Sequence, residues 1–306
     1  MKVKSEYEEH IPYKKIFKNR EKRLRLIGLL RFIPSSLYLK MVFKIKSGKK
    51  LNLKNPKTFC DKLNWLKLHN IHEEYTDMAD KIRVRQIVNV KMGREMFFPL
   101  LGMWERYEDI DFSTLPRSFV LKCNHDSGSV RIIDDKTQIN HEELKKYFNK
   151  RLKRNPYYVG REYPYRHIKP MILAEQNMNL DNPNGINDYK FFCFNGEPQL
   201  MYIATERNSS CKFDFFDMDF NHLDITNIHP HSDKEIDKPI CFEEMKAVAR
   251  TLSQGMPFVR IDLYEIKGRI YFGEYTFFHG GGFWPFKPEK WELKYGDMIS
   301  LKAGDK

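Results

Sequence analysis

Alternating apolar and polar residues predict a series of short strands along the chain. Runs rich in Val, Ile, Phe and Tyr are bounded by turn residues such as Asn-Gly and Lys-Gly, a pattern typical of β-strands joined in hairpins. The predicted strands are residues 119–123, 130–133, 171–175, 189–194, 199–205, 213–217, 258–264 and 269–275. Because many neighbours are linked by tight turns, we expect an α+β fold with mostly antiparallel sheets.

Apolar residues repeated every three or four positions predict helices between these strands. The predicted helices are residues 60–70, 79–91, 142–152 and 242–254. Gly93 and Gly255 follow two of them, where a glycine commonly ends a helix. In this interpretation Asp80-Lys81 opens the second helix.

The N-terminal region carries a different pattern. In residues 19–33 the apolar side chains form one helical stripe flanked by arginines, and a second apolar and basic stretch covers residues 37–46. A basic amphipathic segment binds anionic membrane surfaces through apolar burial and charge attraction. A helix packed on the body of the protein, with its basic side chains in water, fits the pattern equally well. Both interpretations stay open, and residues 19–50 are the candidate for peripheral contact with the inner membrane surface.

Composition predicts a folded chain without a membrane span. Its 306 residues are 41% hydrophobic and 14% aromatic, enough for a sizeable core. We find no window of about 20 apolar residues and expect no signal peptide, because the first residues lack an apolar core. The 5 cysteines are scattered, which predicts reduced thiols and a cytoplasmic location.

The net charge of +12 belongs to one end of the chain. Residues 1–50 hold 15 Lys and Arg against 4 Asp and Glu, and the other 256 residues hold 38 against 37. A nearly neutral body disfavours a broad face for nucleic acid, so we expect no nucleic-acid partner.

The last predicted hairpin carries the strongest candidate for a chemical site. Side chains alternate along a strand, so Arg260 and Asp262 share one face, as do Glu274 and Thr276 on the partner strand. Pairing across the Gly268 turn can place Asp262 opposite Glu274, and facing carboxylates repel unless cations lie between them. Mg²⁺ fits this place, with Arg260 as a planar fork for phosphate. An ordinary surface charge pair explains the same pattern.

A second candidate follows the strand at 119–123. Lys122 precedes a turn in which Ser127, Gly128 and Ser129 could offer N–H groups to a phosphate. The order differs from a Walker A loop, where the lysine follows the glycines. A solvated lysine beside an ordinary hairpin turn is the alternative.

In their order along the chain these motifs resemble the ATP-grasp superfamily, which includes D-alanine–D-alanine ligase. The resemblance implies ATP and Mg²⁺ as cofactors, with Lys81 and Lys122 at the ATP phosphates. It implies that Glu175, with Gln176 and Met178 after it, lies at the adenine. The further nucleotide contacts that it implies are those of Ser127, Gly128, Ser129, Asp188 at the ribose, and Lys190.

The same resemblance assigns metal and catalytic roles. It places Mg²⁺ on Asp262 and Glu274, and Thr276 stands where the family has Asn, a better metal ligand. Catalytic roles fall to Lys122, Arg260, His279 and Gly281. In this interpretation the glycine loop at 279–282 supplies N–H groups to an oxyanion. His279 accepts the proton of an amine or anchors the loop.

At finer grain the chain resembles the TupA-like branch, associated with teichuronopeptide biosynthesis. The matching blocks are residues 55–59, 99–102, 119–125, 188–196, 258–262 and 273–282. The resemblance implies an ATP-grasp fold, in which two α+β lobes with mostly antiparallel sheets grip ATP. The expected division is a basic N-terminal region at 1–54, a helical part at 55–115, a small lobe at 116–176 and a large lobe with the metal site at 177–306.

This resemblance implies an ATP-dependent carboxylate–amine ligase that works through an acyl phosphate. Its expected substrates are small-molecule or glycan carboxylates and amines, in the modification of a bacterial surface polysaccharide or its precursor. The rival is a metal-dependent nucleotide-sugar glycosyltransferase, through the DxD motif Asp217-Met218-Asp219, with a second copy at Asp109-Ile110-Asp111. A non-catalytic module for acidic glycans or membranes is the third hypothesis. His229-Pro230-His231 is interpreted as a loop, not a metal site.

Overall fold

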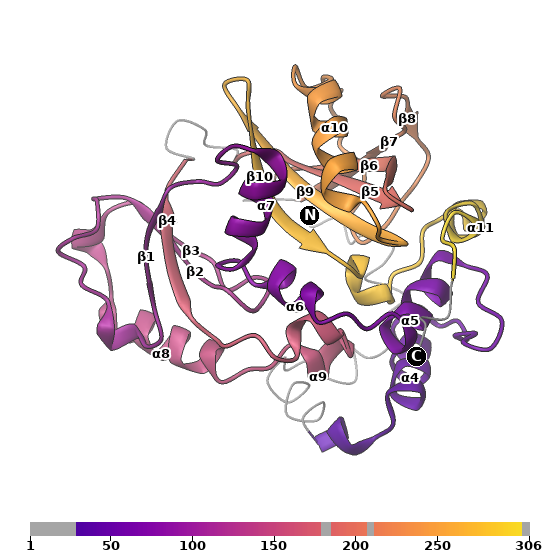
Figure 1. Cartoon of the computed structure of the whole chain (residues 1–306), viewed down its shortest axis with the longest axis horizontal. Helices are drawn as coiled ribbons and strands as arrows, with labels where there is room; N and C mark the ends of the chain where they lie inside the picture. The colour runs from indigo at the N-terminus through magenta and orange to yellow at the C-terminus, as the bar shows by residue number, and fades with distance from the viewer. Residues whose placement is uncertain (1–28, 179–184, 207–210, 302–306) are drawn as a thin grey trace. The chain divides into compact units, whose positions relative to one another are not determined.

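The computed structural model describes residues 29–178, 185–206 and 211–301. They form two compact units, drawn in Figure 1. Among the described residues, unit 1 contains 29–71, 158–162, 185–206 and 211–301, and unit 2 contains 72–157 and 163–178. The part of the predicted amphipathic stripe at residues 19–28 lies outside the described residues. The four segments predicted from the sequence stay a prediction.

Unit 2 is built on a four-stranded antiparallel sheet in the order β1-β4-β2-β3. Its strands are β1 (Leu100–Trp104), β2 (Phe119–Cys123), β3 (Arg131–Ile133) and β4 (Ile172–Gln176). Its helices are α6 (Glu74–Ala79), α7 (Val84–Met92) and α8 (His141–Leu152), and α9 (Tyr157–Gly160) follows at the unit boundary. Phe119, Leu121 and Cys123 point into a core with Phe148 of α8, so Lys122 lies on the opposite face of the sheet.

Unit 1 is built on a six-stranded antiparallel sheet in the order β10-β9-β5-β6-β7-β8. Its strands are β5 (Asp188–Phe194), β6 (Glu197–Thr205), β7 (Lys212–Phe216), β8 (His222–Leu223), β9 (Phe258–Ile266) and β10 (Arg269–Thr276). Its helices are α4 (Ser35–Ser47), α5 (Phe59–His69), α10 (Phe242–Ser253) and α11 (Glu289–Asp297), with a short 3₁₀ helix η5 (His279–Gly282) after β10.

Each face of the large sheet packs against a different partner. On β5, Phe191 contacts Phe242 of α10, which lies along the sheet in Figure 1. On the other face Phe192 and Phe258 meet Phe59 of α5 with ring centroids 6.2 Å and 5.0 Å apart. Each fully buried phenylalanine stabilises the fold by roughly 1.5–3 kcal/mol. This aromatic packing positions β5 and β9, two neighbouring strands in the interior of the sheet.

The start of α5 explains one of the predicted sequence blocks. Thr58 accepts a hydrogen bond from the Asp61 N–H at 3.1 Å, and the Asp61 carboxylate accepts one from the Thr58 N–H at 3.4 Å. This capping box satisfies N–H groups that a helix leaves open at its first turn. The block at 55–59 therefore fixes where α5 begins.

The prediction of an α+β fold with antiparallel hairpins is confirmed, and each predicted strand is present within a few residues. The helix predicted at 79–91 is different. Asp80-Lys81 lies in a turn after α6, and α7 begins at Val84. The Asp80 carboxylate accepts the Ile82 N–H at 2.8 Å, which stabilises the turn before the helix. Among the described helices, none combines the length and apolar character needed to cross a bilayer.

A buried carboxyl group joins α11 to α5. Glu292 is 2% exposed and accepts hydrogen bonds from the backbone N–H groups of Cys60 at 3.0 Å and Phe286 at 2.9 Å. Burial raises the pKa of Glu292 to about 7, although these two N–H groups favour the ionised form.

We predict that this group makes unit 1 less stable as the pH rises. The pKa of Glu292 lies above its ordinary value of 4.5, so the folded chain binds the proton more tightly than the unfolded chain. Its stabilising effect is complete below pH 4.5 and is lost as the pH passes about 7, by at most about 3 kcal/mol. Melting temperatures from pH 4.5 to 8 should therefore fall more steeply for the native chain than for Glu292→Gln.

Glu289→Gln provides the control, because Glu289 lies on the same helix but is exposed. The melting temperature of Glu289→Gln should still fall from pH 4.5 to 8 at least as steeply as that of the native chain. Equal slopes for the native chain and Glu292→Gln would contradict the prediction.

Candidate active site

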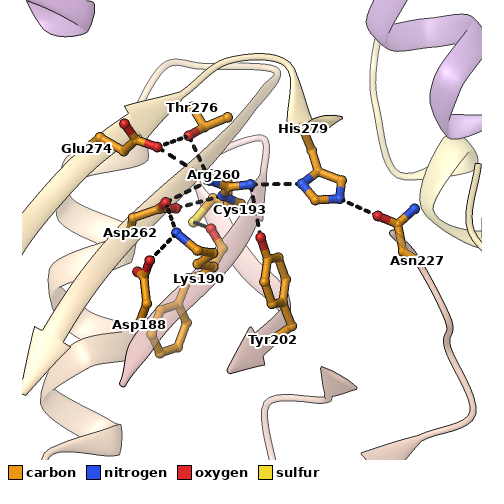
Figure 2. Close-up of polar contacts among 11 residues, drawn as sticks. Asp188, Lys190, Cys193, Tyr202, Asn227, Arg260, Asp262, Glu274, Thr276 and His279 are labelled. Atoms are coloured by element: carbon orange, nitrogen blue, oxygen red, sulfur yellow. Dashed lines mark hydrogen bonds and ion pairs between the residues drawn. The ribbon is translucent and has the colours of Figure 1, made fainter. Parts of the chain in front are cut away.

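The predicted register of the last hairpin is confirmed. Glu274 pairs with Asp262 and Thr276 with Arg260, with a bulge between Phe272 and Glu274. On the other side of β9, Lys190 of β5 pairs with Asp262. Because side chains alternate along a strand, two polar residues from each of β5, β9 and β10 share one face of the sheet. They are Asp188 and Lys190, Arg260 and Asp262, and Glu274 and Thr276. Figure 2 shows this group.

Arg260 is the cation between the two facing carboxylates. Its Nε and Nη2 donate to the two oxygens of Asp262 at 2.6 Å and 2.7 Å, which is a bidentate pair. Nη2 also donates to the Thr276 hydroxyl at 3.0 Å and lies 3.6 Å from Glu274 Oε1. The repulsion that the sequence predicts between Asp262 and Glu274 is thus offset by a side chain of the same strand.

Lys190 connects two further carboxylates. Its Nζ lies 2.7 Å from Asp188 Oδ2 and also forms an ion pair with Asp262. Burial opposes the charged form, but Asp188 and Asp262 hold the pKa of Lys190 above its ordinary value. Burial likewise opposes ionisation of Asp262, but Arg260 and Lys190 hold its pKa below the ordinary range. Lys190 and Asp262 are therefore both charged at neutral pH.

His279 is held by hydrogen bonds on both ring nitrogens. Arg260 Nη1 donates to His279 Nδ1 at 2.8 Å, so the proton is on Nε2, which donates to Asn227 Oδ1 at 2.9 Å. The Asn227 amide is oriented by its own bond to the Trp284 carbonyl at 2.6 Å. Burial and the Arg260 charge hold the pKa of His279 well below its ordinary value. This neutral, buried ring fits the anchoring role that the sequence left open beside proton transfer.

The glycine loop is fixed by two side chains of α5 that sequence reasoning missed. Lys67 Nζ donates to the Gly281 carbonyl at 2.5 Å, and Asn64 donates to the Gly282 carbonyl at 2.6 Å. Gly280 and Gly281 adopt positive φ angles of 56° and 65°, which favour glycine. The Gly281 N–H donates to Phe278 at 2.8 Å, so in this conformation it is used within the loop. Asn64 and Lys67, polar residues on the apolar face of a predicted helix, were the available signal.

Behind this loop lies a buried group of opposite charges in unit 1. Lys67 is 3% exposed and lies over the Phe283 ring at 4.2 Å. Burial lowers the pKa of Lys67 to about 7, against the favourable charge of Glu162. Burial raises the pKa of Glu162, against the charges of Lys67 and Lys46. The loop therefore rests on a lysine and a glutamate whose charged forms are both disfavoured by burial.

In unit 2 three predicted nucleotide ligands form polar contacts with side-chain or backbone groups. Lys122 Nζ lies 2.6 Å from Glu175 Oε2, and Arg85 Nη1 of α7 lies 3.1 Å from Glu175 Oε1. Lys81 Nζ donates to the Asp126 carbonyl at 2.7 Å. Arg85 was not predicted, because it lies 90 positions before Glu175 in the sequence.

The predicted phosphate loop has an ordered base. The Ser129 hydroxyl accepts the Cys123 N–H at 3.1 Å and bonds the Asp126 carboxylate, which pairs with Arg151 at 3.3 Å. Ser127 and Gly128 are exposed at the tip of the loop. The remaining predicted ligands of unit 2, Gln176 and Met178, are exposed and half-buried. In this conformation Ser129 therefore orders the loop, while Ser127 and Gly128 face solvent.

The carboxylates of both DxD motifs form hydrogen bonds or ion pairs with nearby residues in turns. The Asp217 carboxylate accepts the N–H groups of Asp219 at 3.0 Å and Asn221 at 2.8 Å, which closes the turn after β7. Asp109 pairs with Arg106, and Asp111 accepts the Ser113 N–H at 2.9 Å. A turn explains each motif, so no observation favours the glycosyltransferase.

The donor set of unit 1 fits Mg²⁺. The oxygens of Asp262, Glu274 and Thr276 lie on one sheet face, and Mg²⁺ prefers oxygen ligands completed by phosphate. The Glu274 side chain is 33% exposed, so it is accessible to an ion. Both Asp262 oxygens are ion-paired, so a metal there would take the place of one of these pairs.

We predict that Arg260 is required for the stability of this cluster. Arg260→Leu leaves the buried Asp262 with fewer countercharges, and breaking a buried pair costs about 3–5 kcal/mol. Arg260→Lys keeps the charge but not the planar fork, so it should cost less. Urea unfolding followed by circular dichroism measures both. Arg250→Leu breaks an exposed pair with Glu197 and should cost under about 1 kcal/mol; a loss no larger for Arg260→Leu would contradict the prediction.

Comparisons with known proteins find a family match and several similar solved structures. Similar solved structures include D-alanine–D-alanine ligase from Bacillus anthracis complexed with ATP, with 14% identity, TM-score 0.37, and coverage of 65% of this chain and 53% of that one. Another is a RimK domain ATP-grasp protein from Sphaerobacter thermophilus, with 9% identity, TM-score 0.41, and coverage of 80% and 79%. No curated protein matches the chain. The family described as TupA-like ATPgrasp matches residues 61–300, and the chain belongs to this TupA-like ATP-grasp family.

Proposed function

We propose that this protein is an ATP-dependent carboxylate–amine ligase that forms an amide through an acyl phosphate. The observation that carries the proposal is the pair of facing carboxylates, Asp262 and Glu274, held on one sheet face beside Arg260 and Lys190. Membership of an ATP-grasp family supports the use of ATP.

The charge of the cluster favours a nucleotide that arrives with a divalent cation. Asp188, Asp262 and Glu274 contribute three negative charges, and Lys190 and Arg260 contribute two positive ones, which leaves one negative charge. A bare triphosphate would be repelled by this excess, whereas a magnesium nucleotide brings its own positive charge.

The chain's own residues would divide the work of phosphoryl transfer. In the proposal Lys81, Lys122 and Lys190 would contact ATP phosphates, and Asp262 with Glu274 and Thr276 would hold Mg²⁺, which would supply positive charge to the phosphate oxygens. Two predicted sets of contacts complete the proposal: Ser127, Gly128 and Ser129 at the phosphates, and Glu175, Gln176, Met178 and Asp188 at the nucleoside.

Amide formation then follows in two steps. An oxygen of the substrate carboxylate attacks the γ-phosphorus, and the bond from this phosphorus to the bridging oxygen breaks. The products are ADP and an acyl phosphate. The amine nitrogen attacks the acyl carbon, the bond from this carbon to the phosphate oxygen breaks, phosphate leaves, and the amine releases its proton to solvent. Arg260, as a planar donor fork, stabilises the developing charge. His279 positions Arg260 through the 2.8 Å bond. The proposed substrates are the carboxylates and amines of a surface polysaccharide or its precursors.

We predict that the purified chain releases ADP from ATP with Mg²⁺ when a suitable acid and amine are supplied. A coupled ADP assay over amino acids and uronic-acid glycans measures this, and mass spectrometry identifies the amide. Asp262→Asn removes a ligand charge and should lower the rate at least about 100-fold. Lys122→Ala should also impair the reaction.

Asp219→Asn is the matched control, because Asp219 is exposed in the turn after β7. It should leave ADP release unchanged. ADP release that is independent of Asp262, or binding of UDP-sugars in preference to ATP, would contradict the proposed function.

We also propose that the N-terminal part of the chain contacts an anionic membrane surface. Tyr38, Leu39 and Phe43 of α4 are buried against the body of unit 1. Phe32 and Leu37 are instead 79% and 58% exposed. Exposed basic side chains, those of Arg31, Lys40 and Lys44, accompany them. One face of α4 thus packs on the protein while exposed apolar and basic groups remain for lipid.

We predict binding of the full chain to anionic vesicles in a co-sedimentation assay, with little binding to neutral ones. The double variant Phe32→Ser/Leu37→Ser should weaken it about tenfold or more, because two apolar side chains are no longer buried in the interface. Leu293→Ser on α11, where Leu293 is 45% exposed, is the control. Unchanged binding after removal of residues 1–50 would overturn the proposal.

A further inference from the structure

Three side chains of metal-binding type lie together at the end of the large sheet. Asp214 belongs to β7, His222 to β8, and His231 to the segment after β8. One potential ligand atom from each lies within 4.8 Å of the others. The segment after β8 returns to β7, because the Phe213 N–H donates to the Pro230 carbonyl at 3.0 Å. The fold thus joins residues that the sequence places up to 17 positions apart.

Asp214 is a buried carboxylate whose partners are mostly neutral. Its side chain is 3% exposed and accepts the Ser232 N–H at 3.0 Å and His222 Nε2–H at 3.1 Å. Among the described lysines and arginines, none forms an ion pair with it. A buried carboxylate requires a proton or a cation to offset its charge. The His222 side chain is 47% exposed, so a cation from solvent has access.

His231 is oriented as metal-binding histidines commonly are. Its Nε2–H donates to the Ile225 carbonyl at 2.5 Å. In a neutral ring this leaves the lone pair on Nδ1, and a backbone carbonyl on the other nitrogen is the usual outer partner of a ligating imidazole. His222 and His231 lie with ring centroids 5.0 Å apart.

We propose that Asp214, His222 and His231 form a binding site for a first-row divalent transition ion, with Zn²⁺ as the reference ion. Two imidazole nitrogens and one carboxylate oxygen are a donor set that suits Zn²⁺ and leaves a position for water. The ion takes the place of the Nε2 proton of His222 beside Asp214, and the neutral His222 ring then carries its one proton on Nδ1. Mg²⁺ prefers oxygen ligands and binds here weakly.

The site has a structural consequence for the candidate active site. The segment that carries His231 also carries Asn227, which accepts the hydrogen bond of His279. A bound ion connects β7 and β8 to this segment and so restrains the group that orients His279. The inference does not depend on the proposed function, because it concerns other residues and another class of ion.

The test uses tag-free full-length protein without nucleotide. After incubation with Zn²⁺ and exhaustive dialysis, elemental analysis should find one more zinc ion per chain in the native protein than in the double variant His222→Ala/His231→Ala. Isothermal titration should show at least about tenfold weaker binding for Asp214→Asn and each single histidine variant. Co²⁺ should give the visible absorption bands of a low-coordinate site, lost in the same variants. His229→Gln, in the same loop, and Asp262→Asn should retain the ion.

Metal content equal to that of the double variant, or binding that survives loss of all three side chains, would overturn the proposal. So would loss of stability in Asp214→Asn with no metal retained by the native chain, because this result identifies the three residues as a hydrogen-bonded turn anchor. Circular dichroism of each variant confirms that the comparison is made between folded proteins.

Discussion

The contacts of one guanidinium group determine the arrangement of the candidate active site. Arg260 binds Asp262 of its own strand, Thr276 of β10, Tyr202 of β6 and His279 of the glycine loop. Each partner occupies a different donor direction of the planar fork. Three nearby carboxylates can lie on one largely buried sheet face because Arg260 and Lys190 compensate their charge. Strand register, loop position and histidine tautomer are all linked through this group.

The two-residue period of β5 and β9 explains how one sheet both folds and carries chemistry. Phe192 and Phe194 stand on the same face of β5 as Asp188 and Lys190, because even numbers of positions separate these residues. The aromatic end of this face packs under α5, and the charged end is left for a ligand. The same helix, through Lys67, holds the glycine loop. Packing that stabilises the core therefore also sets the position of the charged groups.

The sequence predicts those features of the site whose physical cause lies within a few neighbouring residues of the chain. The pairing of Asp262 with Glu274 follows from strand period and the Gly268 turn, and these are visible in the sequence. Tyr202 and Asn227 complete the Arg260 network from other strands and loops, and no local pattern identifies them. Periodicity alone predicts a helix over Asp80-Lys81. The structure has a turn there, stabilised by the hydrogen bond from the Ile82 N–H to the Asp80 carboxylate, and a turn of this kind leaves no periodic pattern in the sequence.

The same limit applies to groups of metal-binding side chains that come from distant parts of the sequence. His231 was interpreted as a loop residue because its companions, Asp214 and His222, are on strands that only the fold brings back to it. Both DxD motifs resembled metal ligands in sequence, yet their carboxylates bond neighbouring turn N–H groups or side chains. Short acidic motifs indicate chemistry only when their oxygens remain available, and that depends on backbone contacts two to four residues away.

The saturated state of Asp262 constrains how ATP and metal could bind. Both of its oxygens are compensated by Arg260 and Lys190, so a metal bound to Asp262 would displace one of these two cations from the carboxylate. A triphosphate alone meets the excess negative charge of the cluster. If both were bound together, phosphate oxygens would accept from the donors of Arg260 or Lys190, the carboxylate of Asp262 would hold the metal, and each buried charge would keep an opposite charge beside it. Charge compensation in this cluster therefore favours metal and nucleotide binding as one complex.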